Sequence, residues 1–306
     1  MKTAYARISR AAETRARKKT PYEVIEPWLF LLPALAVFCV FLYFPFFKTI
    51  YLSLFLTNKF GQAKLFASFS NYQNILFGKY AGEFWNSMWV TAKFVLFVAS
   101  GGLFIGLCTS LITVRRFPGK AFASAIYAMP IAIASSAAAM SFKMILHKSI
   151  GLLNHLLGTD INWLSSEAWT FPILCILSVW LASGINFIFI SAGLRNIPDE
   201  LYESASIDGA NYWAKLRSIT IPCLSPTLFF QIIINIINAF QSFTLVKLLT
   251  QGGPTNTTNT IVYSIYLDAF RNFRFGSAAA RSIVLFIVIM VITLIQFSYE
   301  KKGVNY

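Results

Sequence analysis

Long apolar runs alternate with shorter polar segments along this chain of 306 residues. Each run reaches or exceeds the roughly 20 residues that a helix needs to cross about 30 Å of hydrocarbon. A bilayer also requires each backbone group to find its partner within the segment, which favours helices over open sheet. The pattern therefore predicts an all-α, polytopic membrane protein with six transmembrane helices, in the runs 28–56, 86–113, 121–146, 171–194, 223–249 and 277–299.

Composition supports the same fold class. Hydrophobic residues make up 57% of the chain, charged residues only 12%, and the mean hydropathy is +0.62. A soluble domain of this size would need more polar residues to cover its surface. The four cysteines are scattered in or beside the apolar runs without a C-x-x-C pair, so we expect them to pack as small hydrophobic residues.

The basic residues predict the orientation of the chain. Clusters of Lys and Arg lie in residues 1–26, at Arg115 and Arg116, and in the tail 300–306. With an even number of spans all three lie on one side, which the positive-inside rule assigns to the cytoplasm. The net charge is +14, but the basic residues are distributed according to the topology of the spans. The charge therefore does not indicate nucleic-acid binding. We expect a basic cytoplasmic tail (1–26), a transmembrane domain (27–299) and a second cytoplasmic tail (300–306).

Motifs of catalysis are missing from the sequence. It contains no G-x-x-x-x-G-K-[ST] phosphate loop, no G-x-S-x-G elbow and no H-E-x-x-H zinc motif. His147 and His155 share one predicted external loop without nearby carboxylates, so two solvated histidines are a better interpretation than a metal site. We expect no catalytic residue, no metal and no cofactor on this chain.

One face of the fifth predicted span is polar. Gln231, Asn235, Asn238 and Ser242 recur at i, i+4, i+7 and i+11, and Gln241 lies beside them. Amides in hydrocarbon need protein partners or water. The stripe therefore either joins helices or lines an aqueous path for an uncharged, hydroxyl-rich solute, and we favour the path. Residues of the fourth span that could add to this lining are Ser178, Trp180, Ser183 and Asn186.

A polar segment, 195–222, separates the fourth and fifth predicted spans and is too long for a simple turn. Pro198 suits a helix start, Gly209 allows a reversal, and Asn211 can cap a second helix before Pro222 opens the next span. An amphipathic helix in this position suits either a groove on a partner or the headgroup surface. Composition alone leaves both interpretations open.

Spacing within this segment adds a resemblance. Glu203-Ser204-Ala205 is followed by three residues, Gly209, nine residues and Ile219-Thr220-Ile221-Pro222. This pattern resembles the EAA loop of the integral membrane subunits of ABC importers, E-A-A-x3-G-x9-I-x-L-P, with Ser204 and Ile221 as mild departures. The stretch LLTQGGPTNTT (248–258) is further similar to carbohydrate-importer permeases of the maltose and glycerol-3-phosphate type, and to the first of their two paired subunits.

The resemblance implies an assembly in the bacterial cytoplasmic membrane. Such a permease pairs with a second permease, sits on two cytoplasmic ATPase subunits that bind ATP and Mg²⁺, and receives solute from an extracytoplasmic binding protein. The solute would be a sugar, an oligosaccharide or a related polyol or glycerol phosphate. The residues implied in coupling to the ATPase are Glu200, Glu203, Ser204, Ala205, Asp208, Gly209, Ile219 and Pro222.

Two other classes remain as alternatives. A self-sufficient secondary transporter or channel usually carries intramembrane carboxylates for ion coupling, and the predicted spans contain no convincing buried Asp or Glu. A membrane-embedded transferase should show clustered acidic or histidine residues at one interface. The sequence shows no such cluster outside the segment 195–222.

Overall fold

The structure, a computed structural model, describes residues 21–114 and 117–303. The chain divides into two units, residues 1–51 and 52–306. The first unit holds α2 (Pro21–Phe38), η1 (Cys39–Tyr43) and most of α3 (Phe44–Ser53), which together make one candidate span, Glu26–Ser53. Most of the predicted basic tail, residues 1–20, lies outside the described residues.

The second unit is helical apart from one short hairpin, in which β1 pairs antiparallel with β2. Its elements in chain order are β1 (Phe55–Thr57), β2 (Ala63–Phe66), α4 (Ser70–Leu76), α5 (Ala81–Val114), α6 (Lys120–Ala132), α7 (Ser135–Ile145), α8 (Leu152–Leu157), α9 (Thr170–Arg195), α10 (Asp199–Ile207), α11 (Tyr212–Lys215), η2 (Leu216–Thr220), α12 (Ile221–Phe240), η3 (Val246–Thr250), α13 (Ile261–Tyr266), η4 (Leu267–Arg271) and α14 (Phe275–Gly303).

The prediction of an all-α polytopic protein is confirmed. Five helices of the described chain are long and apolar enough to cross a membrane. The predicted third span is instead a bent pair, α6 and α7, which meet at 101° and bring the number to six if the pair counts as one span.

The fifth predicted span, 223–249, is wrong in its limits. The helix starts earlier, because α11, η2 and α12 run together over Tyr212–Phe240. It also ends earlier, at Phe240, and the backbone leaves the helix before η3 begins at Val246. The helical stripe therefore stops before Gln241 and Ser242, which belong to the interruption that follows α12.

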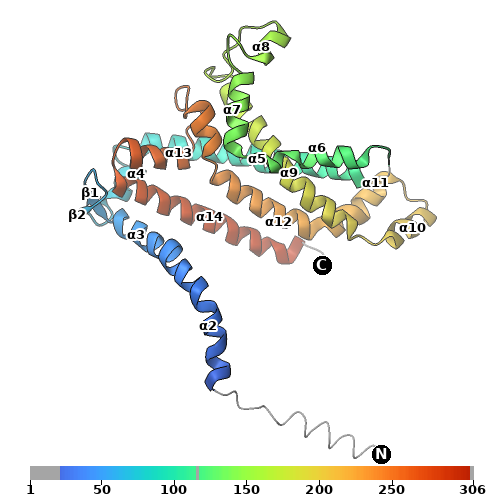
Figure 1. Cartoon of the computed structure of the whole chain (residues 1–306), viewed down its shortest axis with the longest axis horizontal. Helices are drawn as coiled ribbons and strands as arrows, with labels where there is room; N and C mark the ends of the chain where they lie inside the picture. Colours follow the sequence, from blue (N-terminus) through green and yellow to red (C-terminus); the bar gives the residue numbers. More distant parts are fainter. Residues whose placement is uncertain (1–20, 115–116, 304–306) are drawn as a thin grey trace, which may run out of the picture. The chain divides into compact units, whose positions relative to one another are not determined.

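Contacts between helices establish how the second unit is arranged. Gly102 of α5 lies against Ala182 of α9, and further along Ser110 donates a hydrogen bond to the Phe187 carbonyl and accepts one from Ser191, so the two helices run in parallel. In α12, Gln231 donates to the Ile185 carbonyl while Leu224 approaches Gly193, so α12 runs antiparallel to α9. These helices and α14 lie side by side in Figure 1.

This arrangement gives the second unit two distinct ends. The short-loop end carries the connection from α9 through α10 to α11, residues 196–211. The long-loop end carries the segments 54–80, 146–169 and 241–274. Which end faces the cytoplasm remains a prediction from the basic residues.

Close packing of α5 on α9 depends on small residues. A Cβ added to Gly102 would lie 2.9 Å from the Ala182 Cβ, and one added to Gly106 would lie 2.4 Å from the Asn186 Cβ. Neither position has room for a side chain, so glycine allows the two backbones to approach as they do. This contact is what G-x-x-x-G spacing typically provides between helices in a bilayer.

Gly106→Ala should therefore separate α5 from α9 and destabilise the protein by about 1–3 kcal/mol through overpacking. Thermal unfolding of the detergent-solubilised protein measures the effect as a lower midpoint. Gly82→Ala is the matched control, because a Cβ added there in the same helix meets nothing within 4 Å. Equal midpoints for the two variants would contradict the packing account.

Candidate functional site

A cavity of about 500 Å³ lies where two helices are interrupted. The first interruption separates α6 from α7 and contributes Ile131, Ile133 and Ser135 to the lining. The second follows α12 and contributes the segment 241–245. Interrupted helices are typical of solute sites in transporters.

Five of the nine residues named as candidates for the lining of a path come together here. The cavity is lined by Asn235, Asn238, Gln241, Ser242 and Ser178. Trp180 lies elsewhere, with its ring edge-to-face against Phe142 at 5.4 Å between centroids. Gln231 is fully buried outside the cavity, and its Oε1 has no hydrogen-bond partner.

Asn235 has a second role that the spacing alone left open. Its Nδ2 donates to the Asn186 Oδ1 at 2.9 Å, and the Asn186 Nδ2 donates back to the Asn235 Oδ1 at 3.1 Å. Asn186 also packs against Gly106, so this amide pair connects α5, α9 and α12. Asn235 therefore both joins helices and shares the cavity lining with Asn238, Gln241 and Ser242, and the solute path stays a prediction.

The side chains that line this cavity in the described chain are uncharged. Amide and hydroxyl groups offer both donors and acceptors without requiring a counter-ion. Phe94 and Phe243 add aromatic surface to the lining. A pocket of mixed apolar surface with a few polar groups suits a hydroxyl-rich organic solute.

The polar segment at the short-loop end forms the predicted helix–turn–helix. α10 begins after Pro198, and Gly209 adopts φ +76° where the chain reverses. Asn211 caps α11 by accepting a hydrogen bond from the Ala214 N–H at 2.9 Å, as predicted. The second helix does not end before Pro222 as predicted but continues through η2 into α12.

The residues implied in coupling divide between an exposed tip and a partly buried base. Glu200, Glu203, Ser204, Asp208 and Gly209 are exposed, Ala205 is half-buried, and Ile219 and Pro222 are half-buried at the base. Large apolar side chains are exposed on the same segment, with Ile207 87% and Trp213 72% exposed. A surface of this kind, apolar with acidic groups, is typical of a docking site.

The base of the segment is fixed to the spans. The Tyr202 hydroxyl and the Thr220 hydroxyl are hydrogen-bonded at 3.0 Å, which joins α10 to η2. Tyr202 and Ile219 also pack on a small buried cluster of Ile190, Leu194, Ile197 and Leu224. α10 is therefore in contact with both α9 and α12.

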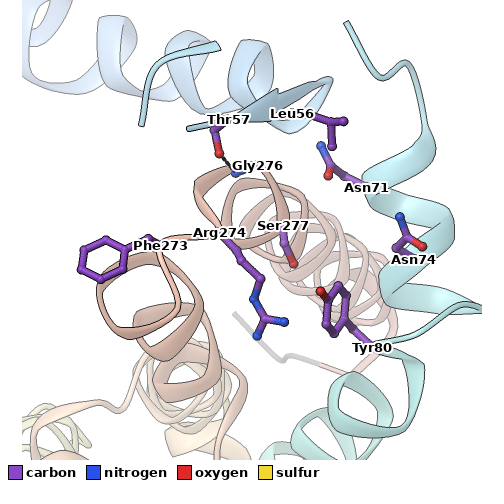
Figure 2. A pocket seen from close by; sticks show the side chains of 9 residues that line it. All are labelled: Leu56, Thr57, Asn71, Asn74, Tyr80, Phe273, Arg274, Gly276 and Ser277. Atoms are coloured by element: carbon purple, nitrogen blue, oxygen red, sulfur yellow. Dashed lines mark hydrogen bonds between the residues drawn. The ribbon is translucent and has the colours of Figure 1, made fainter. Parts of the chain in front are cut away.

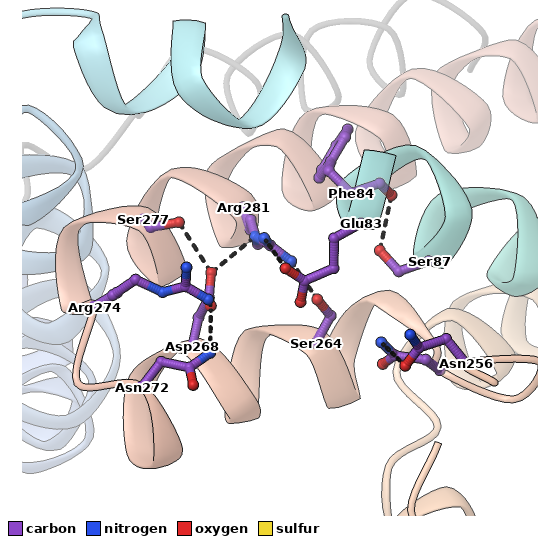
Figure 3. A network of polar contacts seen from close by, with 11 residues as sticks. Glu83, Phe84, Ser87, Asn256, Ser264, Asp268, Asn272, Arg274, Ser277 and Arg281 are labelled. Carbon is purple, nitrogen blue, oxygen red and sulfur yellow. Dashed lines mark hydrogen bonds and ion pairs between the residues drawn. The ribbon is translucent and has the colours of Figure 1, made fainter. Parts of the chain in front are cut away.

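A buried charge network at the long-loop end was missed by the sequence analysis (Figure 3). Asp268 and Arg281 are fully buried, and the Arg281 Nε lies 3.0 Å from the Asp268 Oδ2. Arg281 also donates to the Ser264 hydroxyl and to the Glu83 Oε2, and Arg274 pairs with Asp268. Since removing one partner of a buried pair costs about 3–5 kcal/mol, the network holds α5, η4 and α14 together.

A smaller cavity of about 230 Å³ lies beside this network, between the hairpin, α4 and the start of α14 (Figure 2). The Arg274 guanidinium stands over the Tyr80 ring, 4.2 Å from its centroid. The Thr57 hydroxyl accepts a hydrogen bond from the Gly276 N–H at 3.1 Å. These contacts attach the first long loop to α14.

Both histidines are exposed. His147 is exposed and accepts hydrogen bonds from the Ser149 and Ile150 N–H groups. His155 lies in α8 and is exposed. No group of three or more potential metal ligands occurs among the described residues.

Comparison with known proteins gives one consistent family. The family model described as the binding-protein-dependent transport system inner membrane component matches residues 9–302. A probable ABC transporter permease protein of Brucella suis biovar 1 is 32% identical over 283 residues, 90% of this chain and 97% of that protein. An sn-glycerol-3-phosphate transport system permease protein of Shigella flexneri is 30% identical over 284 residues, 92% of this chain and 95% of that protein.

A solved structure has the same fold. The crystal structure of a bacterial ABC transporter involved in the import of the acidic polysaccharide alginate contains a chain with a TM-score of 0.79 and 24% identity, covering 93% of this chain and 99% of that chain. In this family ATP hydrolysis takes place on separate subunits, so a self-sufficient transporter is not favoured. The chain belongs to the inner membrane components of binding-protein-dependent transport systems, and it is a multi-pass permease subunit of an ATP-driven importer in the cytoplasmic membrane.

Proposed function

We propose that this permease forms half of the path for a carbohydrate-type solute and that α10 couples the path to an ATPase subunit. The observation that carries the proposal is the cavity at two helix interruptions, which the described chain lines with seven neutral polar side chains and no charged one. The relatives support the solute class, because their names refer to sn-glycerol-3-phosphate and to alginate. A second permease would complete the cavity, and an extracytoplasmic binding protein would deliver the solute.

The path would use the two groups of polar residues differently. Asn238, Gln241 and Ser242 face the cavity and can exchange hydrogen bonds with the hydroxyl groups of a passing solute. Each such bond contributes only about 0.5–1.5 kcal/mol, which allows a solute to enter and also to leave. Asn235 and Asn186 would hold the adjacent helices in register while the solute passes.

Coupling would begin at the exposed tip of the polar segment. α10 would insert into a groove on the ATPase subunit, with Ile207 and Trp213 as apolar contacts and Glu203 as the charged contact. Closure of the ATPase subunits on ATP would shift α10. Because Tyr202 and Ile219 pack on the cluster between α9 and α12, that shift would move the spans that line the cavity.

Glu203→Lys should lower ATP-dependent uptake roughly tenfold or more, because it places a like charge opposite the basic partner expected on the ATPase. Gly209→Val should do the same by forcing a β-branched residue to φ +76°, which costs at least about 1–2 kcal/mol. Uptake into proteoliposomes containing the purified complex is the measurement, with membrane insertion checked separately.

Lys64→Glu is the matched control for the charge reversal, since Lys64 is exposed at the opposite end of the unit. It should leave coupling unchanged. Wild-type uptake in both Glu203→Lys and Gly209→Val would show that α10 does not couple to the ATPase.

Asn238→Leu should weaken transport roughly two- to tenfold, because it removes a hydrogen bond from the cavity lining while leaving the amide pair intact. The solute concentration dependence of uptake measures this loss, and co-purification of the ATPase subunits shows that the assembly persists. Gln231→Leu is the control, as Gln231 lies on the same helix but outside the lining. Equal losses in the two variants would contradict a path along Asn238.

A further inference from the structure

Large aromatic side chains are exposed on the first long segment of the second unit, which comprises the hairpin and α4. The most exposed rings are those of Phe60 at 86%, Phe77 at 84%, Phe66 at 68% and Phe69 at 65%. The exposed Gln73 lies four residues from both Phe69 and Phe77, so these three residues share one side of α4. Exposed apolar surface of this kind marks an interaction site.

The same segment is uniformly basic. Residues 54–80 contain Lys59, Lys64 and Lys79 but neither Asp nor Glu. All three lysines are exposed, and none of them forms an ion pair within the described chain. We define the first-loop surface as these three lysines together with the four exposed phenylalanines. Its positive charges have no carboxylate partner.

Two observations place the first-loop surface at the membrane–water interface. Ser53 ends a candidate span, and β1 begins two residues later at Phe55. Since a residue extends the chain by at most about 3.6 Å, the hairpin starts within roughly 7 Å of the end of that span. The exposed Trp85 and Trp89 lie near the start of α5, and the Trp85 Nε1 donates to the Leu76 carbonyl at 3.0 Å. Exposed tryptophans are typical of the headgroup level, so α4 ends at that level.

Hydrogen bonds hold the segment in a fixed position. The Asn71 Nδ2 donates to the Ser53 carbonyl at 2.9 Å and to the Phe55 carbonyl at 3.0 Å, which joins α4 to the hairpin. The Thr57 hydroxyl accepts from the Gly276 N–H, which joins the hairpin to the start of α14 (Figure 2). The exposed rings and lysines are therefore carried by a backbone that is already fixed against a span.

This combination matches the chemistry of an anionic leaflet. Aromatic rings and the alkyl parts of lysines enter the boundary between headgroups and acyl chains, while the ammonium groups remain among the phosphates. Anionic lipids supply negative charge along the whole surface. A zwitterionic leaflet has no net charge and would accept the rings but leave the three lysines uncompensated. At headgroup depth lipid is also the surrounding phase, whereas an acidic protein partner would first have to displace it.

We propose that the first-loop surface docks on anionic phospholipid headgroups in the leaflet at the long-loop end. The phenylalanines set the depth of the loop, and the lysines select the headgroup charge. Through Thr57 and Gly276 the bound leaflet holds the start of α14 at a constant level. This role is separate from the proposed solute path and from coupling at α10.

A fluorophore at Gln73→Cys tests the proposal, because Gln73 is exposed between Phe69 and Phe77. The chain has its four native cysteines replaced and is assembled as the complete complex in phosphatidylcholine nanodiscs. Equal amounts of phosphatidylglycerol or phosphatidylcholine, spin-labelled near the headgroup, are then compared as quenchers. We expect phosphatidylglycerol to quench more strongly. Replacing Lys59 and Lys64 by Gln should lower the ratio of the two quenching constants roughly fivefold or more.

The matched control is Lys148→Gln with Arg271→Gln, which removes the same charge from exposed residues at the same end but outside the first-loop surface. It should leave the quenching ratio unchanged. Phe69→Ser with Phe77→Ser should instead weaken quenching by both lipids, since depth is lost while the lysines remain. Co-purification of the partner subunits verifies the assembly of each variant.

Two results would overturn the proposal. One is equal quenching by the two lipids in the reporter chain, or an equal ratio in the lysine variant and its control, because the lysines would then select no headgroup. The other is a reporter that neither lipid quenches, which would show that a protein partner covers the first-loop surface.

Discussion

Backbone hydrogen bonding inside a bilayer is the constraint on which this structure depends. A span can leave the helical conformation at membrane depth only where protein or a water-filled cavity satisfies the freed N–H and C=O groups. The breaks between α6 and α7 and after α12 both open onto the same cavity. The irregular backbone and the cavity therefore occur at the same place in the second unit.

The helices around the cavity are held by contacts that leave it open. Gly102 and Gly106 bring α5 against α9, and the amide pair of Asn186 and Asn235 adds α12. At the long-loop end, the ion pair of Arg281 with Asp268 fixes α14 to η4. At the short-loop end, the Tyr202–Thr220 hydrogen bond fixes α10 to η2, which continues into α12. A movement of α10 can thus reach the cavity through elements that are packed together.

Local signals in the sequence predicted some features and missed others. The turn at Gly209 and the cap at Asn211 were predicted because each depends on residues a few positions apart. The end of α12 at Phe240 was missed because the residues beyond Ser242 remain apolar. The pairing of Glu83 with Arg281 was missed because it joins residues 198 positions apart, and no local pattern reports such a contact. The roles of the coupling residues stay predictions, since their partner is another chain.

The central claim is that the cavity beside Asn238 is the path of the solute. Its most direct test is thiol accessibility of Asn238→Cys, in a chain whose native Cys39, Cys108, Cys175 and Cys223 are replaced by serine or alanine. Impermeant thiol reagents are applied from each side of the membrane to the complete complex, with and without trapped ATP. The account predicts labelling from one side at rest, labelling from the other side with ATP trapped, and protection by the transported sugar. Labelling from neither side in both states would contradict it.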